Sequence, residues 1–294
     1  MSETQKPLYE SQSFHDFTQI QADRLQILSR LLTDNAVPFT IIPIEDKKHI
    51  YIQFPKTSYS PLFKIKTVLV HYDKDPLSPG ANDNSACIFQ VIDWIIQLLS
   101  DNTVHNIRIF FTDGEEIGSA AEQGSFGIAS RFKKLGITND EVFVLDGCGR
   151  GEVLVISSTG KNAPGNADFK KKFYELYEDA IQIAKSAAAE RWITVPVPYS
   201  DNAGFIACGI PAVAITVLPS DEASLYMRRL QKDKKFEKMV LEHRSTAERF
   251  NSSDLPLTWR LMHGSDDTVS SLTAEAFSLM KKFLNALGKH KTLS

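Results

Sequence analysis

Hydrophobic positions along the chain switch repeatedly between helical and strand-like spacing. From Phe14 to Asp34 apolar residues recur at roughly helical intervals, which predicts a helix. Two β-rich runs, PFTIIPI and HIYIQF, follow and predict a hairpin. The run from Thr67 to Val70 has no polar alternation, which is typical of a strand buried on both faces. A helix, a hairpin and a buried strand are therefore expected to open the protein.

The same alternation continues through the rest of the chain. The loop KDPLSPGANDN is rich in turn-forming residues and leads into an amphipathic helix, SACIFQVIDWIIQLL. The further predicted strands are NIRIFF, EVFVLD and GIPAVAIT, and the further predicted helices are Phe126 to Lys134, FKKKFYELYEDAIQIAKSAAAE and TAEAFSLMKKFLNALGK. Because strands alternate with helices, the pattern predicts an α/β fold of three layers, with a mixed, largely parallel central β-sheet and helices on both faces.

One segment is long for a connection inside a compact domain. Residues 221–261 are helical in composition and heavily charged, and connections above roughly 15 residues are usually functional or mobile. We expect a single α/β domain over residues 1–294, with a helical insertion at about 221–261. The basic run RRLQKDKKFEK within it predicts a solvated helix face, and the alternative is a lid over a site.

Composition narrows the classes of partner. The chain has 294 residues, 43% of them hydrophobic, and a net charge of -3, so it lacks the basic excess that nucleic-acid binding requires. No segment approaches the ~20 apolar residues of a membrane span, and the polar N-terminus contains no signal-peptide core, so a cytoplasmic protein without a membrane partner is expected. Cys87, Cys148 and Cys208 are widely spaced, which favours neither a disulfide framework nor a thiolate metal site.

Ionisable residues collect where the predicted strands end. They are His71 and Asp73, then Glu115 and Glu116, then Asp146, with Asp83 at the start of the intervening helix. The carboxyl ends of parallel strands form one crevice, and adjacent carboxylates repel unless water screens them or a cation lies between them. Oxygen and imidazole ligands suit zinc, with cobalt or manganese possible, and His263 in LMHGSDDTV offers a second imidazole.

Each of these motifs also has a structural explanation. GANDN is a good turn and helix cap, DGEE is an acceptable acidic turn, and His71, Asp146 and His263 are individually compatible with structural roles. Their joint occurrence at one edge of a sheet favours a metal site. The remaining histidines are expected to be solvated, namely His15, His49, His105, His243 and His290. Arg150 is compatible with either a substrate carboxylate contact or a salt bridge.

The motifs HYD, GANDN, DGEEIG, VLD and MHGSDDT, in this order, resemble the ligand motifs of the co-catalytic zinc aminopeptidases of the MH clan. The resemblance covers the chain from Thr67 to the C-terminus. It implies two zinc ions bridged by Asp83, with His71 and Asp146 completing one site and Glu116 and His263 completing the other. It also implies Glu115 as the general base, and Asp73 is placed to accept a hydrogen bond from the second nitrogen of His71.

The resemblance implies an enzyme that hydrolyses the N-terminal peptide bond of a peptide, with a metal-activated water as nucleophile. Two alternatives remain open: the related glutaminyl cyclases, which hold one zinc and perform intramolecular acyl transfer, and a non-catalytic binding homologue. The latter predicts gaps in the ligand series, and the series here is complete. The sequence departs from the family at Asn202, where a histidine is expected after Asp201.

Overall fold

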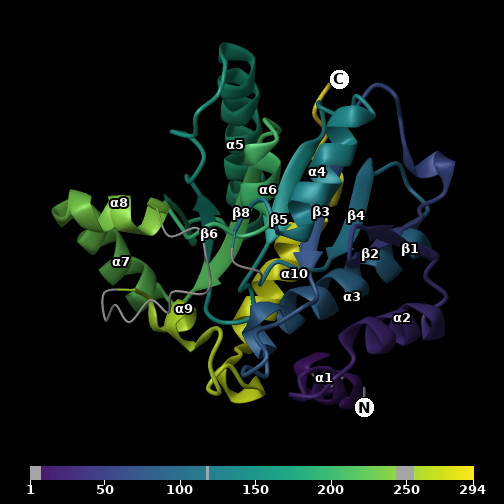
Figure 1. Ribbon diagram of the computed structural model, residues 1–294, viewed down its shortest axis with the longest axis horizontal. Helices are drawn as coiled ribbons and strands as arrows, with labels where there is room; N and C mark the ends of the chain where they lie inside the picture. The colour runs from purple at the N-terminus through teal and green to yellow at the C-terminus, as the bar shows by residue number, and fades with distance from the viewer. Residues whose placement is uncertain (1–7, 117–118, 243–254) are drawn as a thin grey trace.

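An eight-stranded mixed sheet forms the centre of the molecule in the computed structural model, which describes residues 8–116, 119–242 and 255–294 (Figure 1). The strands are β1 (Phe39–Ile44), β2 (Lys47–Ile52), β3 (Lys66–His71), β4 (Ile107–Thr112), β5 (Glu141–Leu145), β6 (Val153–Ser157), β7 (Trp192–Val195) and β8 (Ala212–Leu218). Their order is β1-β2-β4-β3-β5-β8-β6-β7. The central strands β4, β3, β5 and β8 pair in parallel, whereas β2 joins β4 and β6 joins β8 in antiparallel fashion. The predicted mixed, largely parallel sheet is confirmed.

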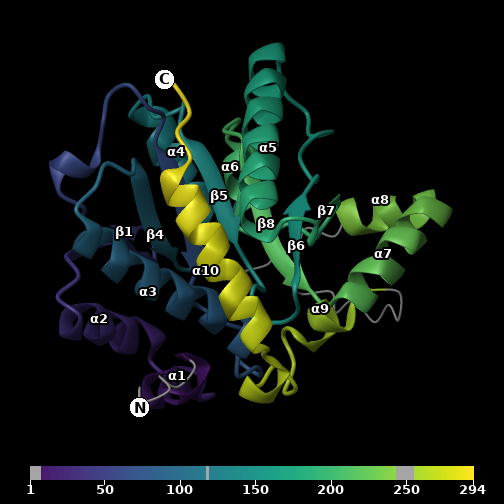
Figure 2. The same ribbon diagram turned by 180° about the vertical axis from the view of Figure 1, so that it is seen from behind.

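Helices cover both faces of this sheet. They are α1 (Gln12–Phe17), α2 (Arg24–Asp34), α3 (Ala86–Asp101), α4 (Gly124–Lys134), α5 (Ala167–Ala188), α6 (Asn202–Ala207), α7 (Ser220–Lys232), α8 (Lys234–Glu242), α9 (Leu257–Leu261) and α10 (Ala274–Lys289). Helices α4 and α6 lie in front of the sheet in Figure 1, while α3, α5 and α10 lie behind it, as Figure 2 shows. The three predicted layers are therefore present.

The central strands are buried on both faces because both sides of each strand meet a helical layer. In β3, Val68 and Val70 pack into the core beneath α3 and α10, while Leu69 between them packs into the core beneath α4 and α6. Successive side chains of a strand point to opposite faces, so a continuous apolar run fits this position. The prediction that Thr67 to Val70 form a strand buried on both faces is confirmed.

Two details differ from the sequence-based expectation. The single helix expected from Phe14 to Asp34 is broken into α1 and α2, because Asp23 caps a new helix by accepting a hydrogen bond from the Gln26 backbone N–H at 3.0 Å. The short elements β6, β7 and α6 were not predicted. Strands β6 and β7 extend the sheet at the edge opposite β1.

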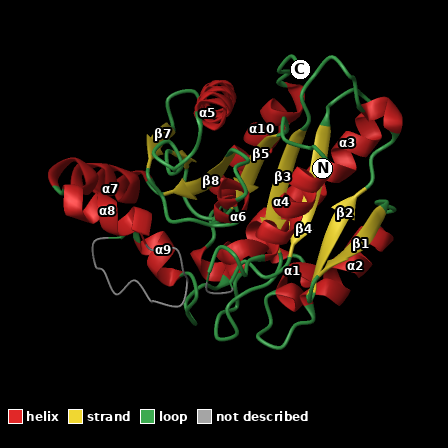
Figure 3. Ribbon diagram, turned by 45° about the horizontal axis from the view of Figure 1, so that its top comes forward, coloured by secondary structure: helices red, strands yellow, loops and turns green. Residues whose placement is uncertain are grey.

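The segment at 221–261 is helical where the structure describes it, with residues 243–254 outside the described part. Helices α7, α8 and α9 lie on the side of the sheet where β7 is the edge strand (Figure 3). The basic side chains of α7 and α8 lie mainly on an exposed face, while Tyr226 and Phe236 are buried underneath, as expected for a solvated amphipathic surface. Among the described residues, no helix has the length and apolar character needed to cross a membrane.

Candidate metal centre

Three parallel strands end side by side and bring the motif residues together. The register pairs His71 of β3 with Thr112 of β4, and Leu69 of β3 with Val144 of β5. The turn after β4 carries Glu115 and Glu116, and Asp146 follows β5 directly. The carboxyl edge of the sheet therefore collects the side chains as the sequence predicts.

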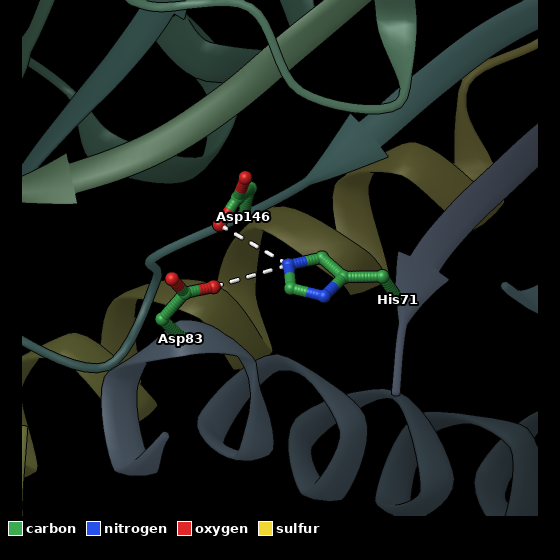
Figure 4. A group of neighbouring side chains, drawn as sticks. All are labelled: His71, Asp83 and Asp146. Carbon is green, nitrogen blue, oxygen red and sulfur yellow. Dashed lines mark ion pairs between the residues drawn. The ribbon is translucent and has the colours of Figure 1, made fainter. Parts of the chain in front are cut away.

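His71, Asp83 and Asp146 form the first group of potential ligands (Figure 4). The Nε2 atom of His71 lies 3.1 Å from Asp83 Oδ1 and 3.7 Å from Asp146 Oδ1. His71 and Asp83 are buried, and Asp146 is half-buried. One imidazole nitrogen and two carboxylate oxygens thus converge on a single point.

Asp83, Glu116 and His263 form a second group that shares Asp83 with the first. His263 Nε2 lies 3.0 Å from Asp83 Oδ2 and 3.4 Å from Glu116 Oε2. The two oxygens of Asp83 therefore face different histidines, which is the geometry a bridging carboxylate requires. The sequence-predicted ligands His71, Asp83, Glu116, Asp146 and His263 are all brought together in these two groups.

Glu115 lies beside both groups and is held by a neighbouring amide. One of its carboxylate oxygens lies within 4.8 Å of a ring nitrogen of His71 and of a carboxylate oxygen of Glu116. Gln123 Nε2 donates to Glu115 Oε1 at 3.2 Å and to its backbone carbonyl at 2.9 Å. Burial raises the pKa of the Glu115 carboxyl well above its usual range, against the opposing charge of His71. Glu115 is thus a fixed, buried carboxyl group close to the candidate ligands.

Asp73 connects His71 to the glutamate turn. Its Oδ1 lies 3.6 Å from His71 Nδ1, and its backbone carbonyl lies 3.3 Å from the same nitrogen. Its Oδ2 accepts a hydrogen bond from the Glu116 backbone N–H at 3.0 Å. Asp73 is therefore placed to orient the imidazole so that Nε2 faces Asp83 and Asp146, as predicted.

Two residues that the sequence did not single out hold the loop bearing Asp83. Asp267 Oδ1 and Oδ2 accept hydrogen bonds from the backbone N–H groups of Asn82 and Asp83 at 2.8 and 3.0 Å. The guanidinium of Arg24 donates to the backbone carbonyls of Tyr72, Asp73, Pro79 and Gly80. Asp267 lies in the quoted MHGSDDT motif, but Arg24 stands in an ordinary amphipathic helix with no signal of this role.

The carboxylates and imidazoles of the centre change one another's pKa. Burial and the nearby Asp83 carboxylate raise the pKa of Glu116 to about 8. Burial opposes protonation of His263, but Asp83 and Glu116 outweigh it and raise the pKa of His263 to about 10. Burial would also raise the pKa of Asp83, yet the adjacent imidazoles of His263 and His71 lower it overall. The carboxylates and imidazoles of the centre are thus close enough to shift one another's pKa strongly.

The donor set fits a dication. Within the described part of the chain, the buried atoms His71 Nε2 and Asp146 Oδ1 have no hydrogen-bond partner. Buried polar atoms without partners are costly, and both of these point to the shared centre, where a metal ion would satisfy them. Nitrogen and oxygen donors without thiolate match the ligand preference expected for zinc in an open site.

Several expectations about other residues need correction. His49 and His105 are fully buried rather than solvated, and His290 is half-buried with its Nε2 atom 3.2 Å from Asp179. His15 is exposed as predicted, and His243 lies outside the described residues. Arg150 forms an ion pair with Glu222, which is the salt-bridge alternative.

Asp201, which precedes the departure from the family pattern at Asn202, is buried behind the glutamate turn. Its carboxylate accepts a hydrogen bond from the Thr112 hydroxyl at the end of β4. Burial raises the pKa of Asp201 to about 6. Asn202 turns inward too, and its Oδ1 accepts from the Ser200 backbone N–H at 2.9 Å.

The structure is a three-layer α/β fold that carries paired histidine–carboxylate groups at the carboxyl edge of its sheet, an arrangement suited to a hydrolase. Peptidase family M28 matches residues 63–287, so the chain belongs to this family and is a peptidase, a hydrolase acting on peptide bonds. The membership agrees with the resemblance to the MH-clan aminopeptidases. A comparison with curated protein sequences gives no match.

Solved structures share the fold at low sequence identity. The LapA aminopeptidase of Legionella pneumophila is 14% identical with a TM-score of 0.63, covering 94% of this chain and 70% of that chain. The zinc aminopeptidase BSAP of Bacillus subtilis is 18% identical with a TM-score of 0.53, covering 82% of this chain and 49% of that chain. A glutaminyl cyclase of Tannerella forsythia is 15% identical with a TM-score of 0.58, covering 91% of this chain and 89% of that chain. This chain thus spans about half the length of the Bacillus enzyme.

Proposed function

We propose that the protein is a zinc-dependent aminopeptidase that binds two zinc ions. His71, Asp83 and Asp146 would hold one ion, and Asp83, Glu116 and His263 the other. The observation that carries this proposal is the position of Asp83, whose two oxygens lie 3.1 and 3.0 Å from the Nε2 atoms of two different histidines. A shared carboxylate offsets the repulsion between two neighbouring dications.

Bound zinc would supply Lewis-acid polarisation of the scissile carbonyl and would make a water molecule more acidic. The chain's own part is proton transfer and orientation. Glu115 takes the proton of the attacking water on its carboxylate and passes it to the leaving amine. The hydrogen bond from Gln123 to Oε1 fixes the rotamer of Glu115 during this transfer.

Asp73 and Asp267 would support the ligands from behind. Asp73 holds the Nδ1 side of His71, so that Nε2 is presented to the metal. Asp267 binds the backbone N–H of Asp83 and thereby fixes the carboxylate that both sites share. The substrate would be a peptide whose N-terminal residue enters at the half-buried side of the centre, where Asp146 and His263 lie.

The glutaminyl cyclase alternative is supported by one observation, the fold likeness to the Tannerella enzyme over most of both chains. The two functions differ in metal stoichiometry. Two zinc ions per chain would favour the aminopeptidase, because the resemblance implies a single zinc for the cyclases.

The test combines metal analysis of the purified protein with release of the N-terminal residue from a panel of aminoacyl chromogenic substrates. We expect two zinc ions per chain and hydrolysis of at least one substrate. One zinc ion, with cyclisation of an N-terminal glutamine and no hydrolysis, would establish the alternative.

The adjacent glutamates provide a sharper test. Glu115→Gln is expected to retain zinc and to lose turnover by about 10²-fold or more, because the attacking water then has no proton acceptor. Glu116→Gln is expected to lose zinc, since an amide oxygen is a poorer ligand for a dication. If Glu115→Gln loses zinc while Glu116→Gln retains it, the two roles are exchanged. If both variants retain zinc and turnover, the glutamate pair is only an acidic turn and the proposal is wrong.

A further inference from the structure

Arg150 joins two parts of the molecule that are remote in sequence. Its Nη1 donates to Glu222 Oε1 on α7 and, at 2.5 Å, to Thr258 Oγ1 on α9. The Thr258 backbone N–H in turn donates to Glu222 Oε2 at 2.8 Å. Glu222 and Thr258 are buried. These three residues form a closed hydrogen-bonded unit, called the Arg150 anchor below.

The anchor joins the two chain segments that carry Asp146 and His263, which are ligands of different candidate zinc sites. Arg150 is in the loop that begins with Asp146, and Thr258 is in the short helix that ends at Leu261, directly before Met262 and His263. The loop that begins with Asp146 also contacts Met262, the residue directly before His263. A Cβ placed on Gly147 would lie 3.2 Å from Cε of Met262, so that side chain packs against the loop backbone.

Helix α9 depends on these contacts for its position. It has five residues, and isolated helices shorter than ~12 residues are marginal in water. Its contacts with the rest of the protein include the Arg150 anchor and the edge-to-face packing of Trp259 on Tyr226, with ring centroids 5.0 Å apart. Without Arg150, the remaining contacts would still hold α9 against α7, but the hydrogen bond that ties α9 to the loop of Asp146 would be lost.

His263 needs this support more than His71 does. Asp73 holds the Nδ1 atom of His71, whereas in the described part of the chain no hydrogen bond reaches Nδ1 of His263. The His263 side chain is 29% exposed, against 0% for His71, and its backbone has φ of 62° in the left-handed region. The position of the His263 imidazole therefore depends on the backbone that follows α9.

We propose that Arg150 is a positioning residue that, through Glu222 and Thr258, places His263 at the second zinc site. This inference rests on the proposed two-zinc function. The anchor ties the loop of Asp146 to the helix preceding His263, so it fixes the spacing between ligands of the two sites. Through this anchor, helices α7 and α9 support the metal centre and are not only an insertion on the surface.

The test measures zinc affinity in solution rather than turnover. Wild type and Arg150→Met, both stripped of metal, are titrated with zinc in competition with a chromophoric chelator. We expect Arg150→Met to weaken one of two zinc sites by about 10- to 100-fold, the usual effect of removing a group that supports a ligand, and to leave the other site unchanged. Arg150→Lys keeps the charge but not the fork of donors, so partial recovery is expected.

Arg108→Met is a matched control. Arg108 pairs with Asp140 at the amino-terminal ends of the parallel strands, away from the candidate ligands. Their side chains are 16% and 10% exposed, against 19% and 10% for Arg150 and Glu222. Its loss should lower stability in a similar way, because the two ion pairs are equally buried. Zinc affinity should stay at the wild-type value at both sites, because neither partner lies near a ligand.

A double variant identifies the affected site. If the anchor acts through His263, then Arg150→Met combined with His263→Ala should bind zinc no more weakly than His263→Ala alone. Additive losses would overturn the inference, as would equal zinc constants for Arg150→Met and Arg108→Met. Should Arg150→Met fail to fold, Thr258→Val, which loses one acceptor of the anchor, is expected to show a smaller loss at the same site, and an unchanged affinity overturns the inference there.

The outcomes also separate this inference from the function on which it rests. A wild-type protein that takes up no zinc would overturn both. A wild-type protein with two zinc sites, together with an Arg150→Met variant that binds zinc equally well, would overturn the positioning role alone.

Discussion

The imidazole of His49 is buried beneath the glutamate turn, where its Nδ1 accepts a hydrogen bond from the Asp113 backbone N–H at 3.2 Å. Only a neutral ring can accept there. Burial lowers the pKa of His49 from 6.5 to about 4, with Asp73 opposing the shift. The folded state therefore binds a proton less readily than the unfolded state, and stability falls as the pH drops through 6.5 towards 4.

The size of the effect follows from the two pKa values. With 6.5 for the unfolded chain and about 4 for the folded one, His49 costs about 0.2 kcal/mol of unfolding free energy at pH 7 and about 2 kcal/mol at pH 5. His49→Asn keeps an acceptor near the Nδ1 position and removes the titration. Between pH 7 and pH 5 the wild type should thus lose about 2 kcal/mol more than this variant.

Urea unfolding at several pH values, with a chelator present throughout, measures this difference. The chelator keeps zinc binding from adding its own pH dependence. The absolute stability of the variant is not the readout, because the substitution also changes packing. Equal slopes of unfolding free energy against pH for the two proteins would refute the reasoning.

Three further substitutions test the support of the candidate ligands. Asp83→Ala should lose zinc from both sites, and metal analysis showing full occupancy with normal turnover would contradict the bridging role. Asp73→Asn should weaken zinc binding by about 10- to 100-fold through a less well oriented His71, measured by chelator competition, and an unchanged constant would show that its carboxylate is dispensable. Asp267→Asn leaves the N–H of Asn82 or Asp83 without a good acceptor and should cost about 1 to 3 kcal/mol in urea unfolding, whereas wild-type stability would show that water replaces the contact.

The parts of the centre carried by strand ends could be predicted from the sequence. A run such as the one ending at His71 is recognisable by its apolar pattern, and parallel pairing then places the residues after each strand at one edge. His71, Glu116 and Asp146 were located in this way. Asp83 needed the additional signal of a turn-rich loop before a helix, and His263 needed the ordered motif series.

The residues that were missed or misjudged depend on contacts between distant segments. His49 lies in a β-rich run in which it and the adjacent Ile50 are both buried, and the sequence does not tell which faces of the strand the helical layers will cover. Arg24 looks like the polar face of an amphipathic helix, yet it is 5% exposed because the loop at 72–85 folds over it. The sequence allowed two roles for Arg150, a substrate carboxylate contact or a salt bridge. The choice between them depends on Glu222, which is far away in sequence.

The candidate ligands are drawn from residues 71 to 263, and this separation has a consequence for how the protein matures. A chain still being synthesised contains the group of His71, Asp83 and Asp146 long before His263 exists. Domains generally fold as units, and contacts of high sequence separation form late. The C-terminal end adds a further constraint, because Lys66 at the start of β3 donates through Nζ to the His290 carbonyl at 2.5 Å. The proposed two-zinc centre is therefore complete only after residues far downstream of the first group have been synthesised and have folded against it.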